Sequence, residues 1–170
     1  MKYIAIIGYG VVGGGITAFL ESNGAEVEKT VGEPVSVKYI VDLREFPESP
    51  YSDRVVHTID PVLADGAVSL VCETMGGAHP AYEYTMAAFQ AGKSVVTSNK
   101  EVVATFGDKL LAEAKKHGAS QLELTVVDGN ERALALYRKM GFDVVGRMPR
   151  GFVFRDGTTH DEIYMVKIIG

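Results

Sequence analysis

Three glycines near the start of the chain have a spacing that lets backbone atoms bind a phosphate. Gly8, Gly10 and Gly13 form a G-x-G-x-x-G motif between an apolar run and a stretch of helical character. Gly8 permits a sharp turn, Gly10 lets a pyrophosphate approach the backbone, and Gly13 lets the helix pack close to the strand. Val11 and Val12 open that helix, whose N-terminus favours anions. The motif predicts a dinucleotide site, with a purely structural glycine turn as the alternative.

An acidic residue ends the next apolar strand, where folds of this kind bind a ribose. Asp42 directly follows the run 35–41. In dinucleotide folds an acid at the end of the second strand binds the adenosine ribose hydroxyls, and this contact would favour NAD. Arg44, close behind, could instead meet a 2′-phosphate, so the choice between NAD and NADP stays open. A solvated aspartate at a strand end is the alternative to both.

Two more loops carry candidate ligand contacts. Met75 and Gly76 belong to a second glycine-rich turn, 73–77, and Asn99 and Lys100 lie where a helix begins after another strand. Asn99 is also expected to cap that helix, and an exposed surface lysine is the alternative for Lys100. All these loops follow the carboxyl ends of strands, which form the ligand-binding edge of an open α/β sheet.

The elements that must position these loops alternate between strands and helices. Apolar runs indicate the strands, and helical periodicity, in most cases closed by a glycine, indicates the helices. A polar insert is expected over 24–34, after the first helix. The expected strands are 3–7, 35–41, 55–56, 67–72 and 93–97, and the expected helices are 12–23, 61–64, 78–91 and 100–117. This pattern predicts an α/β fold with a Rossmann-like, mainly parallel sheet and helices on both faces.

Three segments before residue 118 carry a family resemblance: G-Y-G-V-V-G-G-G, then E-T-M-G-G with the following P-A, then A-G-K-S-V-V-T-S-N-K. Together they resemble the nucleotide-binding domain of homoserine dehydrogenase. In that family a Thr-Ala-Asn-Lys segment lines the nicotinamide and substrate side of the cleft. The resemblance therefore implies that Asn99 and Lys100 face the reactive end of an NAD or NADP cofactor. Ser98 differs mildly from the alanine of that family.

The segment after residue 118 follows another pattern. The sequence predicts an alternating strand over 122–127 and a helix over 131–140. Two further strands, 143–148 and 162–169, are expected to reverse around 156–157.

The run L-T-V-V-D-G-N-E-R-A-L-A-L-Y-R-K-M-G-F in this segment resembles the C-terminal half of GNAT-type acetyltransferases. In that family the asparagine and tyrosine that match Asn130 and Tyr137 contact acetyl-CoA. The pyrophosphate loop of the family is absent, since 97–102 reads T-S-N-K-E-V. We therefore expect Asn130 and Tyr137 to serve as helix cap and core, without acetyl-CoA.

The two likenesses predict one fused domain, with a dinucleotide-binding fragment at 1–118 and an acetyltransferase-like fragment at 119–170. The strand after the join is expected to extend the parallel sheet through a right-handed crossover. The last hairpin would form an antiparallel edge, and 162–169 or its hairpin partner could pair with a second copy in a homodimer. The chain is interpreted as a chimera, engineered or recombined, with a natural fusion or a truncated dehydrogenase as the alternatives.

Composition narrows the possible partners and location. The chain has 170 residues, 46% of them hydrophobic, and a formal net charge of −5 with no basic stripe for nucleic acid. The single cysteine, Cys72, allows no internal disulfide, and no segment has the length of a signal peptide or membrane span. We therefore expect a cytoplasmic protein. The histidines have no metal-binding spacing: His57, His79, His117 and His160.

The function expected from these observations is dinucleotide binding without turnover. The resemblance implies that a homoserine dehydrogenase would continue into a large substrate and dimerisation domain, and the residues after 118 do not resemble one. No catalytic residue is assigned, and Lys100 and Tyr137 are only vestigial candidates. The alternatives are a purely structural protein with both sites vestigial, and an oxidoreductase fragment of the homoserine dehydrogenase type.

Overall fold

The computed structural model describes residues 1–154 and 156–169, and the chain divides into two compact units, 1–117 and 118–170. Each unit is described by itself. Over these described residues, no helix combines the length and the apolar character needed to cross a membrane.

The first unit is built on a five-stranded sheet in which every neighbouring pair of strands is parallel. The strand order is β3-β2-β1-β4-β5, so the chain starts in the middle and builds the sheet outward in both directions. The strands are β1 (Lys2–Ile7), β2 (Val35–Val41), β3 (Val55–Val56), β4 (Val68–Glu73) and β5 (Ser94–Thr97). The change of direction beside β1 is the point at which ligands bind in open α/β sheets.

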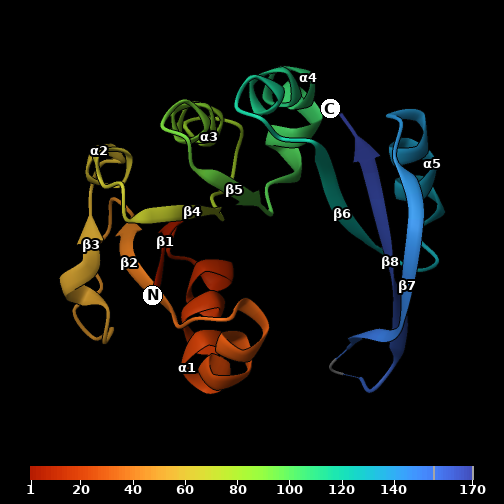
Figure 1. Cartoon of the computed structure of the whole chain (residues 1–170). Coiled ribbons are helices and arrows are strands. Elements are labelled where there is room, and N and C mark those ends of the chain that lie inside the picture. Colours follow the sequence, from red (N-terminus) through yellow and green to blue (C-terminus); the bar gives the residue numbers. More distant parts are fainter. Residues whose placement is uncertain (155, 170) are drawn as a thin grey trace. The chain divides into compact units, whose positions relative to one another are not determined.

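Helices cover both faces of this sheet, as Figure 1 shows. They are α1 (Val11–Val31), α2 (Asp60–Ala64), α3 (Ala81–Gln90) and α4 (Lys100–Lys116), with a short 3-10 turn at Ser52–Arg54. Ile16 and Leu20 of α1 pack on one side of β1, against Ile4 and Ile6. Successive strand residues point to opposite faces, and the alternate residues therefore pack against α2 and α3.

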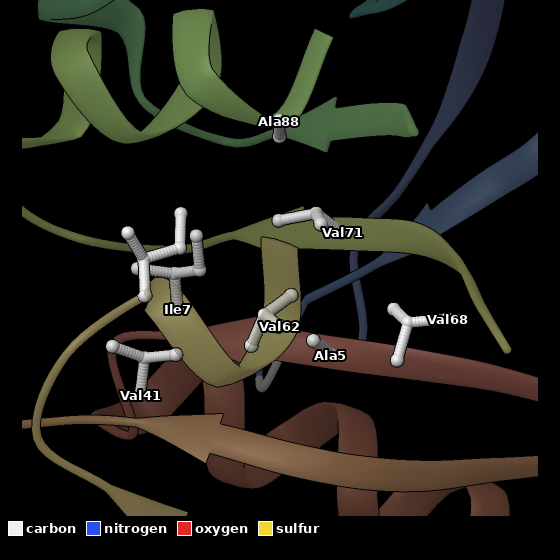
Figure 2. Close-up of a cluster of buried hydrophobic side chains, with 8 residues drawn as sticks. Ala5, Ile7, Val41, Val62, Val68, Val71 and Ala88 are labelled. Atoms are coloured by element: carbon white, nitrogen blue, oxygen red, sulfur yellow. The ribbon is translucent and has the colours of Figure 1, made fainter. Parts of the chain in front are cut away.

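The core on the α2 and α3 side is almost completely apolar. Figure 2 shows Val62 of α2 and Ala88 of α3 among side chains from β1, β2 and β4. Ala5, Ile7 and Val71 in this cluster have no exposed surface. Such strands, buried on both faces, are typical of parallel sheets. The predicted Rossmann-like sheet with helices on both faces is confirmed.

The first helix is longer than the sequence predicted. Instead of ending at Asn23 before a polar insert over 24–34, α1 continues to Val31. Asn23 has non-helical angles (φ −126°, ψ 16°), so the expected end is a kink after which the helix resumes. Gly32 ends the helix in the left-handed conformation (φ 85°) and donates its N–H to the Glu28 carbonyl at 2.7 Å.

The second unit is a three-stranded antiparallel sheet in the order β6-β8-β7. Its elements are β6 (Gln121–Val127), α5 (Glu131–Lys139), β7 (Asp143–Val153) and β8 (Thr159–Ile168). Leu134 of α5 packs on Val126, Ile163 and Met165 from the strands. This unit therefore has an apolar core of its own.

The prediction that 122–127 would extend the parallel sheet is wrong. β6 pairs with β8, from Gln121 opposite Ile168 to Val127 opposite Glu162. Leu122, Leu124 and Val126 face the core while Glu123 and Thr125 are exposed, and this alternation suits an antiparallel strand with one solvated face. β8 is the central strand, so the expected edge at 162–169 is wrong. Its hairpin partner β7, the other expected edge, is an edge strand, and among the described residues β6 is the second edge of this sheet.

Candidate functional site

Two of the three motif glycines are required by the packing of the turn between β1 and α1. Gly8 has φ +89°, and a Cβ there would lie 3.1 Å from the backbone N of Met75. A Cβ on Gly13 would lie only 2.2 Å from the carbonyl oxygen of Gly8. No real contact is that short, so Gly13 lets α1 approach the strand, as the sequence predicted.

Gly10 differs from both, because packing does not require it. It is the N-cap residue of α1, and a Cβ built on it meets no atom within 4 Å. The helix also has no side-chain cap and no acidic residue in its first turn. Val11 and Val12 are the first residues of α1. The positive end of the helix dipole at this N-terminus is therefore not neutralised by a carboxylate in the first turn of the helix.

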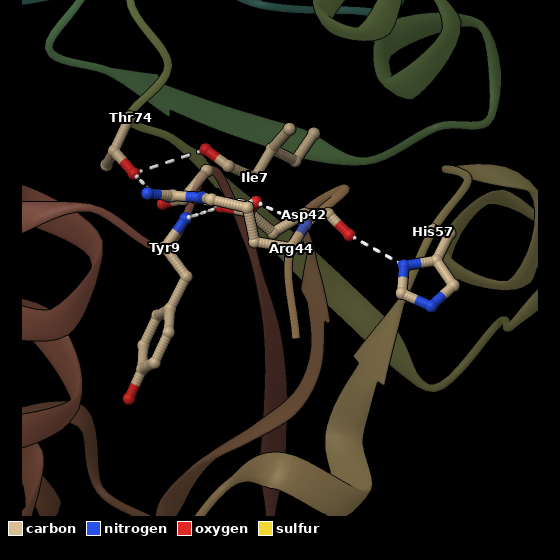
Figure 3. Close-up of polar contacts among 7 residues, drawn as sticks. Ile7, Tyr9, Asp42, Arg44, His57 and Thr74 are labelled. Atoms are coloured by element: carbon tan, nitrogen blue, oxygen red, sulfur yellow. Dashed lines mark hydrogen bonds and ion pairs between the residues drawn. The ribbon is translucent and has the colours of Figure 1, made fainter. Parts of the chain in front are cut away.

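Asp42 connects the end of β2 to this glycine turn. Its Oδ2 accepts the Tyr9 backbone N–H at 2.8 Å, as Figure 3 shows. Arg44 donates its backbone N–H and Nε to Oδ1, both at 3.0 Å, and its Nη2 to Oδ2 at 2.9 Å. These hydrogen bonds from Arg44, above all those of its guanidinium, hold the pKa of the Asp42 carboxyl well below its usual range.

The Tyr9 side chain ties the glycine turn to the loop that follows Asp42. Its hydroxyl lies 3.0 Å from Thr17 Oγ1 and 3.2 Å from Ser49 Oγ. Its ring meets Phe46 edge-on at 5.0 Å, and the Arg44 guanidinium lies 5.1 Å from the centre of the same Phe46 ring. The turn and the loop after β2 are therefore held together at several points.

A cavity of about 320 Å³ opens beside these groups. It brings together four of the residues predicted from the sequence: Gly8, Asp42, Arg44 and Met75. The others predicted, which do not line it, are Gly10, Val11, Val12, Gly13, Gly76, Asn99 and Lys100. A larger hollow of about 690 Å³ on the α1 side is lined mostly by apolar side chains and lacks Asp42 and Arg44. A ligand site combines a cavity with a few polar groups that converge on it, and Asp42 and Arg44 do so at the smaller cavity.

Asn99 and Lys100 follow β5 and lie at the start of α4, as expected. Asn99 is buried and caps α4, because its Oδ1 accepts the Val102 N–H at 3.1 Å. Its Nδ2 donates to the Gly77 carbonyl at 2.7 Å, which connects the cap to the second glycine-rich turn. Lys100 is exposed on the first turn of the helix.

Several residues at this edge were not found by sequence reasoning. Thr74 donates its hydroxyl to the Gly8 carbonyl at 2.6 Å and so fastens the two glycine-rich turns together. His57 lines the cavity, and its Nδ1 lies 2.9 Å from the Asp42 carbonyl oxygen, a contact that raises the pKa of the imidazole. Tyr84 lines the cavity from α3. No local spacing signals these three, since each depends on how distant segments meet.

In the second unit Asn130 and Tyr137 have the structural roles predicted for them. The Asn130 Oδ1 accepts the Ala133 N–H at 3.1 Å and caps α5. Tyr137 packs against the core, with its ring centre 6.0 Å from that of Phe142.

Comparison with known proteins finds two family models along the chain. The model described as "Homoserine dehydrogenase, NAD binding domain" matches residues 8–122. The model of the acetyltransferase (GNAT) family matches residues 106–142. The order of the two matches is the order of the two resemblances.

Individual relatives agree with the first match. A homoserine dehydrogenase of Lactococcus lactis is 34% identical over 119 residues, which is 67% of this chain and 28% of that protein. One of Bacillus subtilis is 31% identical over 161 residues, or 92% of this chain and 36% of that protein. The crystal structure of a homoserine dehydrogenase from Thiobacillus denitrificans superposes with a TM-score of 0.63 at 29% identity, covering 69% of this chain and 28% of that one. The chain thus spans about a third of the length of these two curated relatives.

Proposed function

We propose, from the premise that this chain belongs to the family of the NAD-binding domain of homoserine dehydrogenase, that its first unit binds a nicotinamide dinucleotide at the glycine turn. The observation that carries the proposal is the cavity in which Gly8, Asp42, Arg44 and Met75 meet. Beside it, α1 begins at an uncapped N-terminus on a glycine whose Cβ position is empty. A pyrophosphate placed there would accept hydrogen bonds from backbone N–H groups and interact favourably with the helix dipole.

The hydrogen bonds of Asp42 favour NADP as the dinucleotide. A carboxylate offers about four lone-pair positions, and Asp42 already accepts one hydrogen bond from Tyr9 and three from Arg44. A ribose diol would find no acceptor there unless Arg44 moved away. The side chain of Asp42 is also only 9% exposed.

Arg44, in contrast, can still donate. Its side chain is 64% exposed, and Nε and Nη2 are the guanidinium atoms that bond Asp42. A guanidinium has five N–H donors, so donors remain for the oxygens of a 2′-phosphate. Asp42 would then orient Arg44 rather than bind the ribose itself.

We further propose that the 170-residue chain binds the cofactor without oxidising homoserine. The long match is to the domain described as NAD binding, and the described residues of the second unit form an antiparallel sheet on which α5 packs. The chimeric origin is likewise a proposal, supported by the succession of two family matches. The GNAT match ends at residue 142, and we assign no acetyl-CoA site to it.

Titration of NADP into the unmutated chain and into Gly10→Val, followed by thermal unfolding, tests the binding proposal. A ligand that binds only the native state stabilises it by about 2.7 kcal/mol at one hundred times its dissociation constant. We expect the unfolding midpoint to rise for the unmutated chain and to stay constant for Gly10→Val. The valine side chain would occupy the space in which the phosphates would bind. The variant should fold, since its Cβ meets no protein atom. An equal rise in both proteins would contradict a site at this turn.

A further inference from the structure

Glu73, at the end of β4, is a carboxylate without any exposed surface. Its Oε1 accepts the Met75 N–H at 2.7 Å, and its Oε2 accepts the hydroxyl of Thr97. Within residues 1–154 and 156–169 no lysine, arginine or histidine forms an ion pair with it. Burying a carboxylate without a cation is costly. An apolar residue would fill a strand end without that cost, so the two hydrogen bonds indicate a specific role.

Thr97 extends the contact to the neighbouring strand end. Glu73 and Thr97 are opposite each other in the β4–β5 register. The Thr97 Oγ1 that donates to Glu73 also accepts the Asn99 backbone N–H at 2.9 Å. One hydroxyl therefore connects the buried carboxylate to the start of α4.

The contacts close into a ring. The Asn99 Nδ2 donates to the Gly77 carbonyl at 2.7 Å, and Gly77 belongs to the turn whose Met75 N–H is bound by Glu73. The turn after β4 and the N-terminus of α4 are thus fixed to each other through Glu73, Thr97 and Asn99. Removing any of the three side chains would weaken this connection and leave the backbone hydrogen bond from the Ser98 N–H to the Glu73 carbonyl, at 3.1 Å, to hold the two segments.

The position of this ring in the sheet decides which half of a dinucleotide it would affect. The strand order places β2, with Asp42, on one side of β1 and places β4 and β5 on the other. A dinucleotide with its pyrophosphate at the β1 turn and its adenosine ribose at the end of β2 must extend its second half over β4 and β5. The ring therefore lies on the nicotinamide side.

We propose that Glu73 and Thr97 are positioning residues that hold the Met75–Gly76 turn and the Asn99–Lys100 segment against the nicotinamide half of the bound dinucleotide. This inference rests on the proposed function. Neither residue contacts the cofactor, and both act through the backbone of the loops they fix. The adenosine half, bound at the end of β2, does not depend on them.

The test compares two probes on Thr97→Val, which keeps the shape of threonine and removes the hydroxyl. NADP spans both halves of the site, whereas adenosine 2′,5′-bisphosphate stops before the nicotinamide. We expect Thr97→Val to weaken NADP by about tenfold and to leave the affinity of the bisphosphate within about twofold. Thr97→Ser, which restores the hydroxyl, should bind both probes like the unmutated chain.

Glu73→Met is the second variant, in case Thr97→Val does not fold. It has a volume similar to that of Glu73 but lacks both acceptor oxygens, and the same selective loss of NADP is expected. Unchanged NADP affinity in either folded variant would overturn the inference, and so would an equal loss of both probes, which indicates a merely structural role. If neither probe binds the unmutated chain, the proposed function itself fails, and this inference fails with it.

Discussion

Asn99 in the first unit and Asn130 in the second unit both cap a helix, but they differ in burial and in the other hydrogen bonds that they form. Asn99 and Asn130 both accept the N–H of the third helical residue at 3.1 Å. Asn99 is buried, and it also donates to Gly77 and bonds Thr97 through its backbone. Asn130 is exposed, and its side chain makes only the cap bond among the contacts of the described residues. The same local motif thus belongs to a connected polar network in one unit and only ends a helix in the other.

The arginine–aspartate contacts of the two units also differ in their surroundings. In the first unit Asp42 and Arg44 meet beside a cavity and a glycine turn. In the second unit Arg147 bridges Asp128 and Asp161 at 3.0 Å each, and Asp161 also accepts the Arg150 N–H at 2.9 Å. These contacts connect β7 to β8 and to the turn after β6, and they pair the charges with one another. An arginine–aspartate pair therefore indicates a ligand site only where other groups leave room for a ligand.

The largest effect on the free energy of unfolding is expected at Gly13, where the glycine turn of the first unit leaves no space for a side chain. Gly13→Ala would place a methyl group 2.2 Å from the Gly8 carbonyl oxygen. Overpacking of this kind costs about 3 kcal/mol, and urea denaturation would measure it. Gly15→Ala is the matched control in the same helix, since nothing lies within 4 Å of its Cβ position. The control should gain about 0.5–1 kcal/mol from the better helix propensity of alanine. Equal stability of the two variants would contradict the close approach at Gly13.

The two caps provide a direct test of the contrast between the units. Asn130→Ala should lower the free energy of unfolding by about 1 kcal/mol, the usual value of an exposed cap. Asn99→Ala should cost about 2 kcal/mol, because it removes the hydrogen bond to the Gly77 carbonyl as well as the cap. Urea denaturation of both variants under the same conditions gives the difference. Similar losses would show that the network around Asn99 adds nothing to the cap.

Sequence reasoning recovered the elements whose signals are local. The strands around Ile7 and Val41 and the cap at Asn99 follow from nearby residues. The end of the first helix was predicted at Asn23, which was interpreted as a terminus. In the structure the helix only kinks at Asn23 and then resumes. The pairing of β6 was misplaced because the partner of Gln121 is Ile168, far along the chain. The contacts of Glu73, Thr97 and His57 could not be predicted, since they form only when separate strand ends meet.

The central claim is that the glycine turn, Asp42 and Arg44 form one site for a 2′-phosphorylated dinucleotide, and the ratio of the NADP and NAD dissociation constants tests it most directly. We expect NADP to bind the unmutated chain about tenfold to a hundredfold more tightly than NAD, the value of one charge-assisted contact of about 1.5–3 kcal/mol. Arg44→Ala should reverse the preference, because it removes the phosphate donor and frees the acceptors of Asp42 for a ribose diol. Arg132→Ala, at an exposed arginine of α5, changes the net charge equally and should leave the ratio unaltered. Tighter binding of NAD than of NADP by the unmutated chain, or an unchanged ratio in Arg44→Ala, would contradict the claim.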